Sequence, residues 1–200
     1  MKHQVIAIHG GTSFNTHKQY ISFLRTRELT KEALRHCDDW RSSLAAELGD
    51  AFEVLVPKMP NGTNAHYAEW CIWLERCMKF IEDDAVLIGH SLGGIFLVKY
   101  ISEHAFPRRI KAVILVSAPY DQTLTAEFLT DFSLPKSLDG FSRQVRELYL
   151  VYSKDDPVVS IEEQNKYMRA LPCAHVLQLD NWGHFQQQHF PELIELIRSL

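Results

Sequence analysis

A serine flanked by glycines marks the point where a buried strand meets a helix in this chain. The motif Gly-His-Ser-Leu-Gly at 89–93 follows the apolar run 85–88 and precedes the apolar stretch 95–101. A strand-to-helix turn this tight strains its central residue and needs residues without a β-carbon two positions to either side. The following helix would direct its free amide groups and positive dipole end toward the serine oxygen. A glycine-flanked serine alone can be an ordinary turn, but this order of elements predicts a nucleophile elbow at Ser91.

The size and composition of the chain bound its class. Two hundred residues fit a single domain spanning 1–200. With 46% hydrophobic and 23% charged residues, the chain resembles an ordinary soluble globular protein. Its net charge of -4 supplies no broad basic field, so a nucleic-acid partner is not expected. The first apolar run, at 5–8, is too short for a signal peptide, and no stretch reaches the length of a membrane span.

The cysteines predict free thiols. Cys37, Cys71, Cys77 and Cys173 include no Cys-x-x-Cys pair. Cys71 and Cys77 are six residues apart, which puts them on different faces of one helix. We therefore expect reduced cysteines and a cytoplasmic location.

Short apolar runs alternate with helical patterns along the whole chain. The runs lie at 5–8, 52–56, 86–88, 112–116, 147–152 and 176–179. Several are almost continuously apolar, as expected of parallel strands covered by helices on both faces. The predicted class is α/β, with about six mostly parallel strands.

Capping signals place the helices between these strands. Asp38 or Asp39 can begin a helix over 40–48, which Gly49 ends. Thr63 or Asn64 opens a second helix that runs through residue 81, and further helices are expected at 161–170 and 192–200. Pro191 fits the first turn of the last helix.

Two connections are longer than a strand-to-helix link requires, at 12–37 and 120–142. Both leave the carboxyl ends of strands, the edge at which open α/β sheets bind ligands. They could form the walls or a small lid of a pocket lined by their aromatic residues, Phe14, Tyr20, Phe23, Phe128 and Phe132. Ordinary local packing of these rings is an equally good interpretation.

Partners for Ser91 follow in the chain order nucleophile, acid, base. After the fifth run comes Asp155-Asp156-Pro-Val-Val, and Asp156 is preferred because it directly precedes the Pro-Val-Val turn. After the sixth run comes His184, where Gly183 gives the loop freedom to turn the ring back toward Ser91. These three residues are the candidate catalytic groups.

The other histidines fit the role of the catalytic base less well than His184. His9 and His90 lie at strand ends, where local packing or hydrogen bonding is expected rather than proton transfer. His175 and His189 are weak reserves for the base.

Donors for an oxyanion are expected from two backbone segments. The amide of Leu92 directly follows the nucleophile, and a second amide should come from the loop after the first strand. Gly11 is the first choice there and Thr12 the second. The same Gly-Gly pair is a poor phosphate loop because no Gly-Lys-Ser/Thr follows it.

Together, five short motifs resemble the small serine hydrolases of the α/β-hydrolase fold that are similar to retinoblastoma-binding protein 9. The motifs are Pro-Lys-Met-Pro at 57–60, Ile-Gly-His-Ser at 88–91, Leu-Val-Ser-Ala at 115–118, Asp-Asp-Pro at 155–157 and Gly-His-Phe-Gln at 183–186. The resemblance covers most of the chain after residue 57. It implies a Ser91–Asp156–His184 triad, no metal or organic cofactor, and a compact fold that has no large lid and lacks the first antiparallel strands of larger relatives.

Two departures limit what the resemblance implies. The segment 12–37 is longer than this family leads us to expect, so pocket shape and substrate choice do not carry over. Binding to the retinoblastoma pocket protein uses Leu-x-Cys-x-Glu, but the nearest match here, at 171–175, ends in His. That protein partner is not implied.

The expected function is hydrolysis of small to medium esters or thioesters, with amides also open to the same machinery. The alternative is a non-catalytic protein that keeps the hydrolase fold to bind a ligand or another protein. Acyl transfer to an acceptor other than water is a third interpretation. The complete set of Ser91, Asp156 and His184 favours the enzyme.

Overall fold

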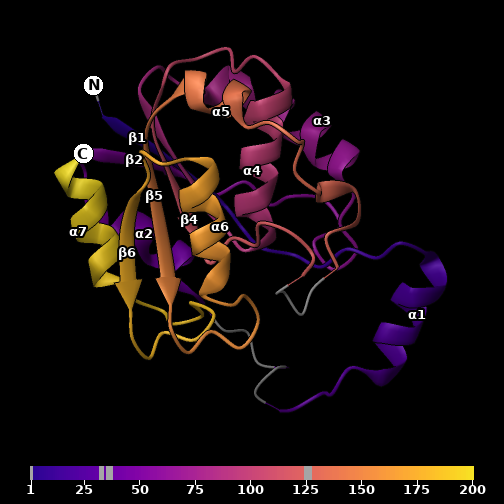
Figure 1. The fold of residues 1–200 in the computed structure, drawn as a ribbon. Coiled ribbons are helices and arrows are strands. Elements are labelled where there is room, and N and C mark those ends of the chain that lie inside the picture. The colour runs from indigo at the N-terminus through magenta and orange to yellow at the C-terminus, as the bar shows by residue number, and fades with distance from the viewer. Residues whose placement is uncertain (1, 32–33, 35–37, 124–127) are drawn as a thin grey trace.

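The computed structural model describes residues 2–31, 34, 38–123 and 128–200. Within them, six strands form one sheet in the order β2-β1-β3-β4-β5-β6, and every neighbouring pair is parallel (Figure 1). The strands are β1 His3–Ile8, β2 Phe52–Leu55, β3 Ala85–His90, β4 Ile110–Val116, β5 Val145–Ser153 and β6 His175–Leu179. The predicted α/β class and the six strands are confirmed.

Helices cover both faces of the sheet, as the apolar strands predicted. Against one face lie α2 (Trp40–Leu48) and α7 (Pro191–Ser199). The other face carries α3 (Tyr67–Cys77), α4 (Leu92–Glu103), α5 (Asp139–Gln144) and α6 (Glu162–Ala170). The central strand β3 is buried along its whole length between these two layers. The elbow that follows β3 is therefore built on the most enclosed part of the fold.

Most helix boundaries match the capping signals. Asp39, not Asp38, caps α2, because its side chain accepts from the Arg41 amide at 2.9 Å. Gly49 ends α2 with a φ of 81°, a conformation that side-chain-bearing residues rarely adopt. Pro191 occupies the first position of α7.

The helix expected from Thr63 or Asn64 through residue 81 was placed wrongly at both ends. The Asn64 amide bonds within a turn, and the Ala65 amide donates to the Thr12 carbonyl at 2.8 Å. These amides tie 61–65 to the loop after β1, so α3 begins only at Tyr67. It ends at Cys77, and a 3-10 turn, Met78–Phe80, follows.

The two long connections contain short helices that the sequence analysis did not predict. Helix α1 (His17–Thr26) lies in the first connection and stands away from the sheet (Figure 1). The second contains a 3-10 turn (Thr130–Phe132) and the start of α5. No large lid forms from the described residues of these connections.

Two further expectations concern the cysteines and membrane spans. Cys71, Cys77 and Cys173 are free, whereas Cys37 lies outside the described residues. Among the helices of the described ranges, none is long and apolar enough to cross a membrane.

Candidate active site

Ser91 occupies the turn between β3 and α4 in a strained backbone conformation. Its φ of 51° and ψ of -122° are rare for a residue with a side chain. Its amide donates to the Val116 carbonyl at 2.9 Å, which fixes the turn against β4. A β-carbon on Gly89 would lie 2.5 Å from the Gly94 Cα, and one on Gly93 would lie 2.5 Å from the His9 carbonyl oxygen. Both glycines are therefore required by close backbone approach.

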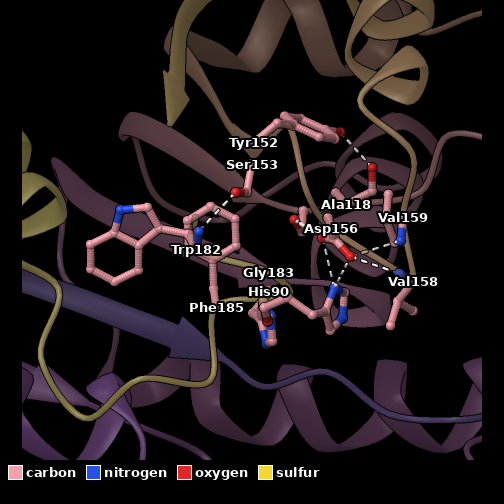
Figure 2. Close-up of polar contacts among 12 residues, drawn as sticks. His90, Ala118, Tyr152, Ser153, Asp156, Val158, Val159, Trp182, Gly183 and Phe185 are labelled. Atoms are coloured by element: carbon pink, nitrogen blue, oxygen red, sulfur yellow. Dashed lines mark hydrogen bonds and ion pairs between the residues drawn. The ribbon is translucent and has the colours of Figure 1, made fainter. Parts of the chain in front are cut away.

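Asp156 contacts the ring of His184. The His184 Nδ1 lies 2.9 Å from Asp156 Oδ2 and 3.1 Å from Oδ1. The amides of Val158 and Val159 donate to Oδ1 at 2.8 and 3.0 Å (Figure 2). The Asp156 side chain is fully buried, so these donors replace the water that an exposed carboxylate would have.

This environment keeps Asp156 ionised. Burial alone would raise the pKa of Asp156, but the hydrogen bond and charge of His184 oppose it, together with the Ser117 hydroxyl and the Val159 amide. The net effect lowers the pKa below its usual value. An ionised carboxylate can accept a hydrogen bond from the His184 imidazole when its Nδ1 carries the proton.

Asp155 faces a different part of the same loop. It accepts from the Ser153 hydroxyl and from the Gly183 amide, the latter at 3.1 Å. Ser153 Oγ in turn accepts from the Trp182 amide at 3.0 Å (Figure 2). Asp155 therefore holds the backbone just before His184, while Asp156 contacts the ring.

Ser117 is a site residue that the sequence analysis did not identify as such. Its hydroxyl donates to Asp156 Oδ2 at 2.5 Å, and its amide donates to the Val151 carbonyl. Like Ser91, Ser117 has a positive φ, of 44°. The available signal was a hydroxyl residue directly after the buried strand β4, at the sheet edge that carries Ser91.

The other histidines make local contacts, as expected for His9, and the reserve candidates His175 and His189 contact residues outside the candidate site. His9 Nε2 accepts from the Met59 amide at 2.8 Å, and its Nδ1 bonds to the Gly10 carbonyl. Burial lowers the pKa of His9, which keeps the ring neutral. His175 stacks on Tyr149, and His189 pairs with Glu47 at 2.8 Å.

The backbone groups predicted as oxyanion donors differ in their bonding. The Thr12 amide donates to the Gly62 carbonyl at 2.9 Å and is therefore occupied. Among the described residues, no backbone carbonyl accepts from the Gly11 or Leu92 amide. The pairing of Ile8 with Gly89 brings the end of β1, and with it Gly11, beside the elbow.

A cavity of about 970 Å³ lies beside Ser91 and His184. Its lining includes Gly10, Gly11, Ser91 and His184, together with Arg41 and Lys58. None of the five aromatic residues of the long connections is part of that lining. Phe14 packs instead on Tyr20, Phe23 and Phe128, and buried Phe132 packs on Trp70 and Phe96. The local-packing interpretation of these rings is therefore favoured.

Comparison with known proteins places the chain in a family. The model of the serine hydrolase family matches residues 34–196. The chain belongs to the serine hydrolase family. A relative named serine hydrolase RBBP9, from Rattus norvegicus, is 29% identical over 152 residues, covering 74% of this chain and 78% of that protein.

Solved structures share the α/β-hydrolase fold of this serine hydrolase. The ydeN gene product of Bacillus subtilis superimposes with a TM-score of 0.76 at 18% identity, covering 99% of this chain and 98% of that one. The esterase RhEst1 from a Rhodococcus species gives a TM-score of 0.61 at 13% identity, covering 99% of this chain and 90% of that one. At these identities the likeness establishes the fold alone.

A metal centre would require a group of ligating side chains around the candidate site. In the part of the chain that the structure describes, no three His, Cys, Asp or Glu side chains are grouped to hold a metal ion. At this edge of the sheet, the candidate site groups a hydroxyl, an imidazole, a carboxylate and backbone amides.

Proposed function

We propose that this protein hydrolyses small to medium esters or thioesters through a covalent acyl-enzyme on Ser91. The observation that carries the proposal is the contact between His184 Nδ1 and the buried Asp156 carboxylate, because His184 and Ser91 line the same cavity. A carboxylate accepts only, so Nδ1 carries the proton and Nε2 has a free lone pair. An imidazole in that tautomer can act as a general base.

The first half of the reaction forms the acyl-enzyme. Ser91 Oγ attacks the substrate carbonyl and its proton passes to His184 Nε2, while Asp156 stabilises the imidazolium. The amides of Leu92 and Gly11 donate to the oxyanion, at roughly 3 kcal/mol of barrier reduction for each donor. As the intermediate collapses, the bond to the leaving group breaks and His184 returns the proton to the departing alcohol or thiol.

The second half regenerates the enzyme. Water attacks the acyl carbonyl, and His184 takes its proton as base. The Ser91–acyl bond breaks, Ser91 regains its proton from His184, and the carboxylic acid leaves.

The cavity supports a substrate of limited size. Its volume of about 970 Å³ lies within the range of small-molecule sites, and its lining mixes backbone, charged and small apolar groups. Short acyl chains fit this lining better than long lipid chains.

Trapping the acyl-enzyme tests the proposal. The protein is mixed with a chromogenic acetate ester and a matched thioester, quenched in acid within the first turnover, and analysed by intact and peptide mass spectrometry. We expect one acetyl group on the peptide that contains Ser91, and none on the folded Ser91→Ala variant. Steady turnover of both esters without any acylated serine would contradict the proposed mechanism.

A second readout separates hydrolysis from the alternatives. Added alcohol or amine should leave the rate of ester loss unchanged if water is the acceptor. Faster ester loss with a matching new product would indicate acyl transfer. No turnover and no acylation of the folded protein would favour a ligand-binding role.

A further inference from the structure

A chain of polar contacts runs from the start of α2 to the backbone of His184. The Asp39 carboxylate pairs with the Arg41 guanidinium. Arg41 Nη1 lies 2.8 Å from His90 Nδ1, and His90 Nε2 lies 3.0 Å from the His184 carbonyl oxygen. His90 directly precedes Ser91 in the elbow. The chain therefore connects three elements that are far apart in the sequence.

The two ends of this chain fix the tautomer of His90. A guanidinium only donates, so His90 Nδ1 must be the acceptor and carry no proton. A carbonyl oxygen only accepts, so His90 Nε2 must carry the proton and donate to His184. Both contacts are made at once only by the neutral Nε2–H form.

The surroundings of His90 keep it in that neutral form. The ring is buried, and burial is the main reason that its pKa lies well below the usual value. His184, Arg41 and His9 are the charged or titratable groups around it, and each of them lowers the pKa further by repulsion. His90 can thus lie with its ring centroid 4.9 Å from that of His184 without competing for a proton.

The loop that carries His184 needs such external contacts. Asn181, Gly183 and Phe185 all have positive φ values, of 62°, 51° and 54°. Positive φ is unfavourable for the two residues with side chains, Asn181 and Phe185, so this backbone is held by its surroundings. Trp40 Nε1 donates to the Phe185 carbonyl at 2.9 Å, and His90 supplies the corresponding donor to the residue that bears the proposed base.

We propose that His90 is a positioning residue for His184, held as its Nε2–H tautomer by Arg41 and Asp39. This inference rests on the proposed function of His184 as the general base. His90 acts on the ring through the backbone carbonyl of His184, and Arg41 acts on His90. No proton passes through His90 during the reaction.

Three substitutions at two positions test the role of His90. Glutamine has a donor and an acceptor spaced like the two ring nitrogens, so His90→Gln can make both contacts, whereas His90→Leu can make neither. We expect His90→Leu to lower kcat for the acetate ester by about 10- to 100-fold with little change in KM, because the base is misplaced. His90→Gln should recover most of that loss. His189→Leu is the control for loss of a histidine ring, because His189 is exposed, follows His184 in the chain and does not line the cavity, and it should keep full activity.

The role of Arg41 is tested through the pH dependence. The Arg41→Met substitution removes the hydrogen-bond donor to His90 Nδ1 and a positive charge that repels a protonated His90 ring. The pKa of His90 should therefore rise. Protonation of His90 should then appear as an additional ionisation on the acid limb of the kcat/KM profile. The double variant Arg41→Met/His90→Leu should be no worse than His90→Leu alone, because both changes break the same chain. Additive losses, or a wild-type kcat in folded His90→Leu, would overturn the proposal.

Histidine-ring NMR distinguishes failure of this proposal from failure of the proposed function, because it needs no turnover. With 15N-labelled histidine, wild-type protein should show His90 as the Nε2–H tautomer and a protected Nδ1–H on His184. His90→Leu should speed the exchange of that His184 proton, and His90→Gln should restore its protection. Unchanged exchange in His90→Leu would reject the positioning role, whatever the activity of the protein.

Discussion

Asp155 and Asp156 are neighbours in sequence, yet they hold different parts of the His184 loop. Asp156 contacts the ring through both carboxylate oxygens, while Asp155 accepts from the Gly183 amide. Desolvation of Asp156 is compensated by several donors, which lower its pKa and keep it charged. Two consecutive residues of one turn therefore have different roles, because Asp156 orients the His184 ring and Asp155 fixes the backbone before it.

The two aspartates should respond differently to replacement by asparagine. In Asp156→Asn the amide can donate to Nδ1, which favours the wrong imidazole tautomer, and we expect kcat to fall by roughly 10³- to 10⁴-fold. Asp155→Asn keeps an acceptor for the Gly183 amide and should lose far less activity. Steady-state kinetics with a chromogenic ester, with circular dichroism to confirm folding, measures both. Equal losses in the two variants would contradict this division of roles.

At the level of elements, the sequence predicted the strands better than the helices. A short, continuously apolar run such as that of β4 favours a buried strand over other secondary structures. All six strands begin and end within three residues of their predicted bounds. Helix α1 was missed because none of its residues is buried, although Thr16 and Gln19 form the capping box that its sequence allows. The start of α3 was misplaced because backbone bonds to Thr12, far away in sequence, hold the turn before it.

The elbow between β3 and α4 should tolerate a single added carbon poorly. In Gly93→Ala the new β-carbon would lie 2.5 Å from the His9 carbonyl and 2.7 Å from that of Ile8, so backbone must shift. We expect a loss of about 3 kcal/mol in the free energy of unfolding, measured by urea titration. Gly49→Ala is the comparison, because it has a positive φ but no atom within 4 Å of the added carbon. A smaller loss for Gly93→Ala than for Gly49→Ala would contradict the close approach.

At the scale of the whole molecule, the parallel sheet brings distant residues to one edge. The parallel pairing of β3 with β4, β4 with β5 and β5 with β6 places the strand ends that precede Ser91, Asp156 and His184 at the same edge of the sheet. Chain order and strand ends were enough to nominate these three residues from the sequence. The contacts of Ser117 with Asp156 and of Arg41 with His90 were not predictable, because they join positions 39 and 49 residues apart and depend on side-chain orientation.

The buried neutral histidines should make the stability of the whole molecule depend on pH. Burial lowers the folded-state pKa of His90 and of His9 below 6.5, so the unfolded chain binds protons that the folded protein does not. Stability is then fully present above pH 6.5 and falls as the pH decreases. For His90 alone we expect a loss of about 1 kcal/mol between pH 6.5 and 5.5, measured by urea unfolding. His90→Gln should show a shallower loss over the same interval, and an identical slope would contradict the assignment.

Labelling with a fluorophosphonate shows whether Ser91 is an activated nucleophile. The purified protein is incubated with the probe, and the modified residue is located by intact and peptide mass spectrometry, with Ser91→Ala as the control. We expect one adduct per chain, on Ser91, and slower labelling in Asp156→Asn and in His184→Ala. Absence of labelling in folded protein, or an adduct on another residue, would contradict it.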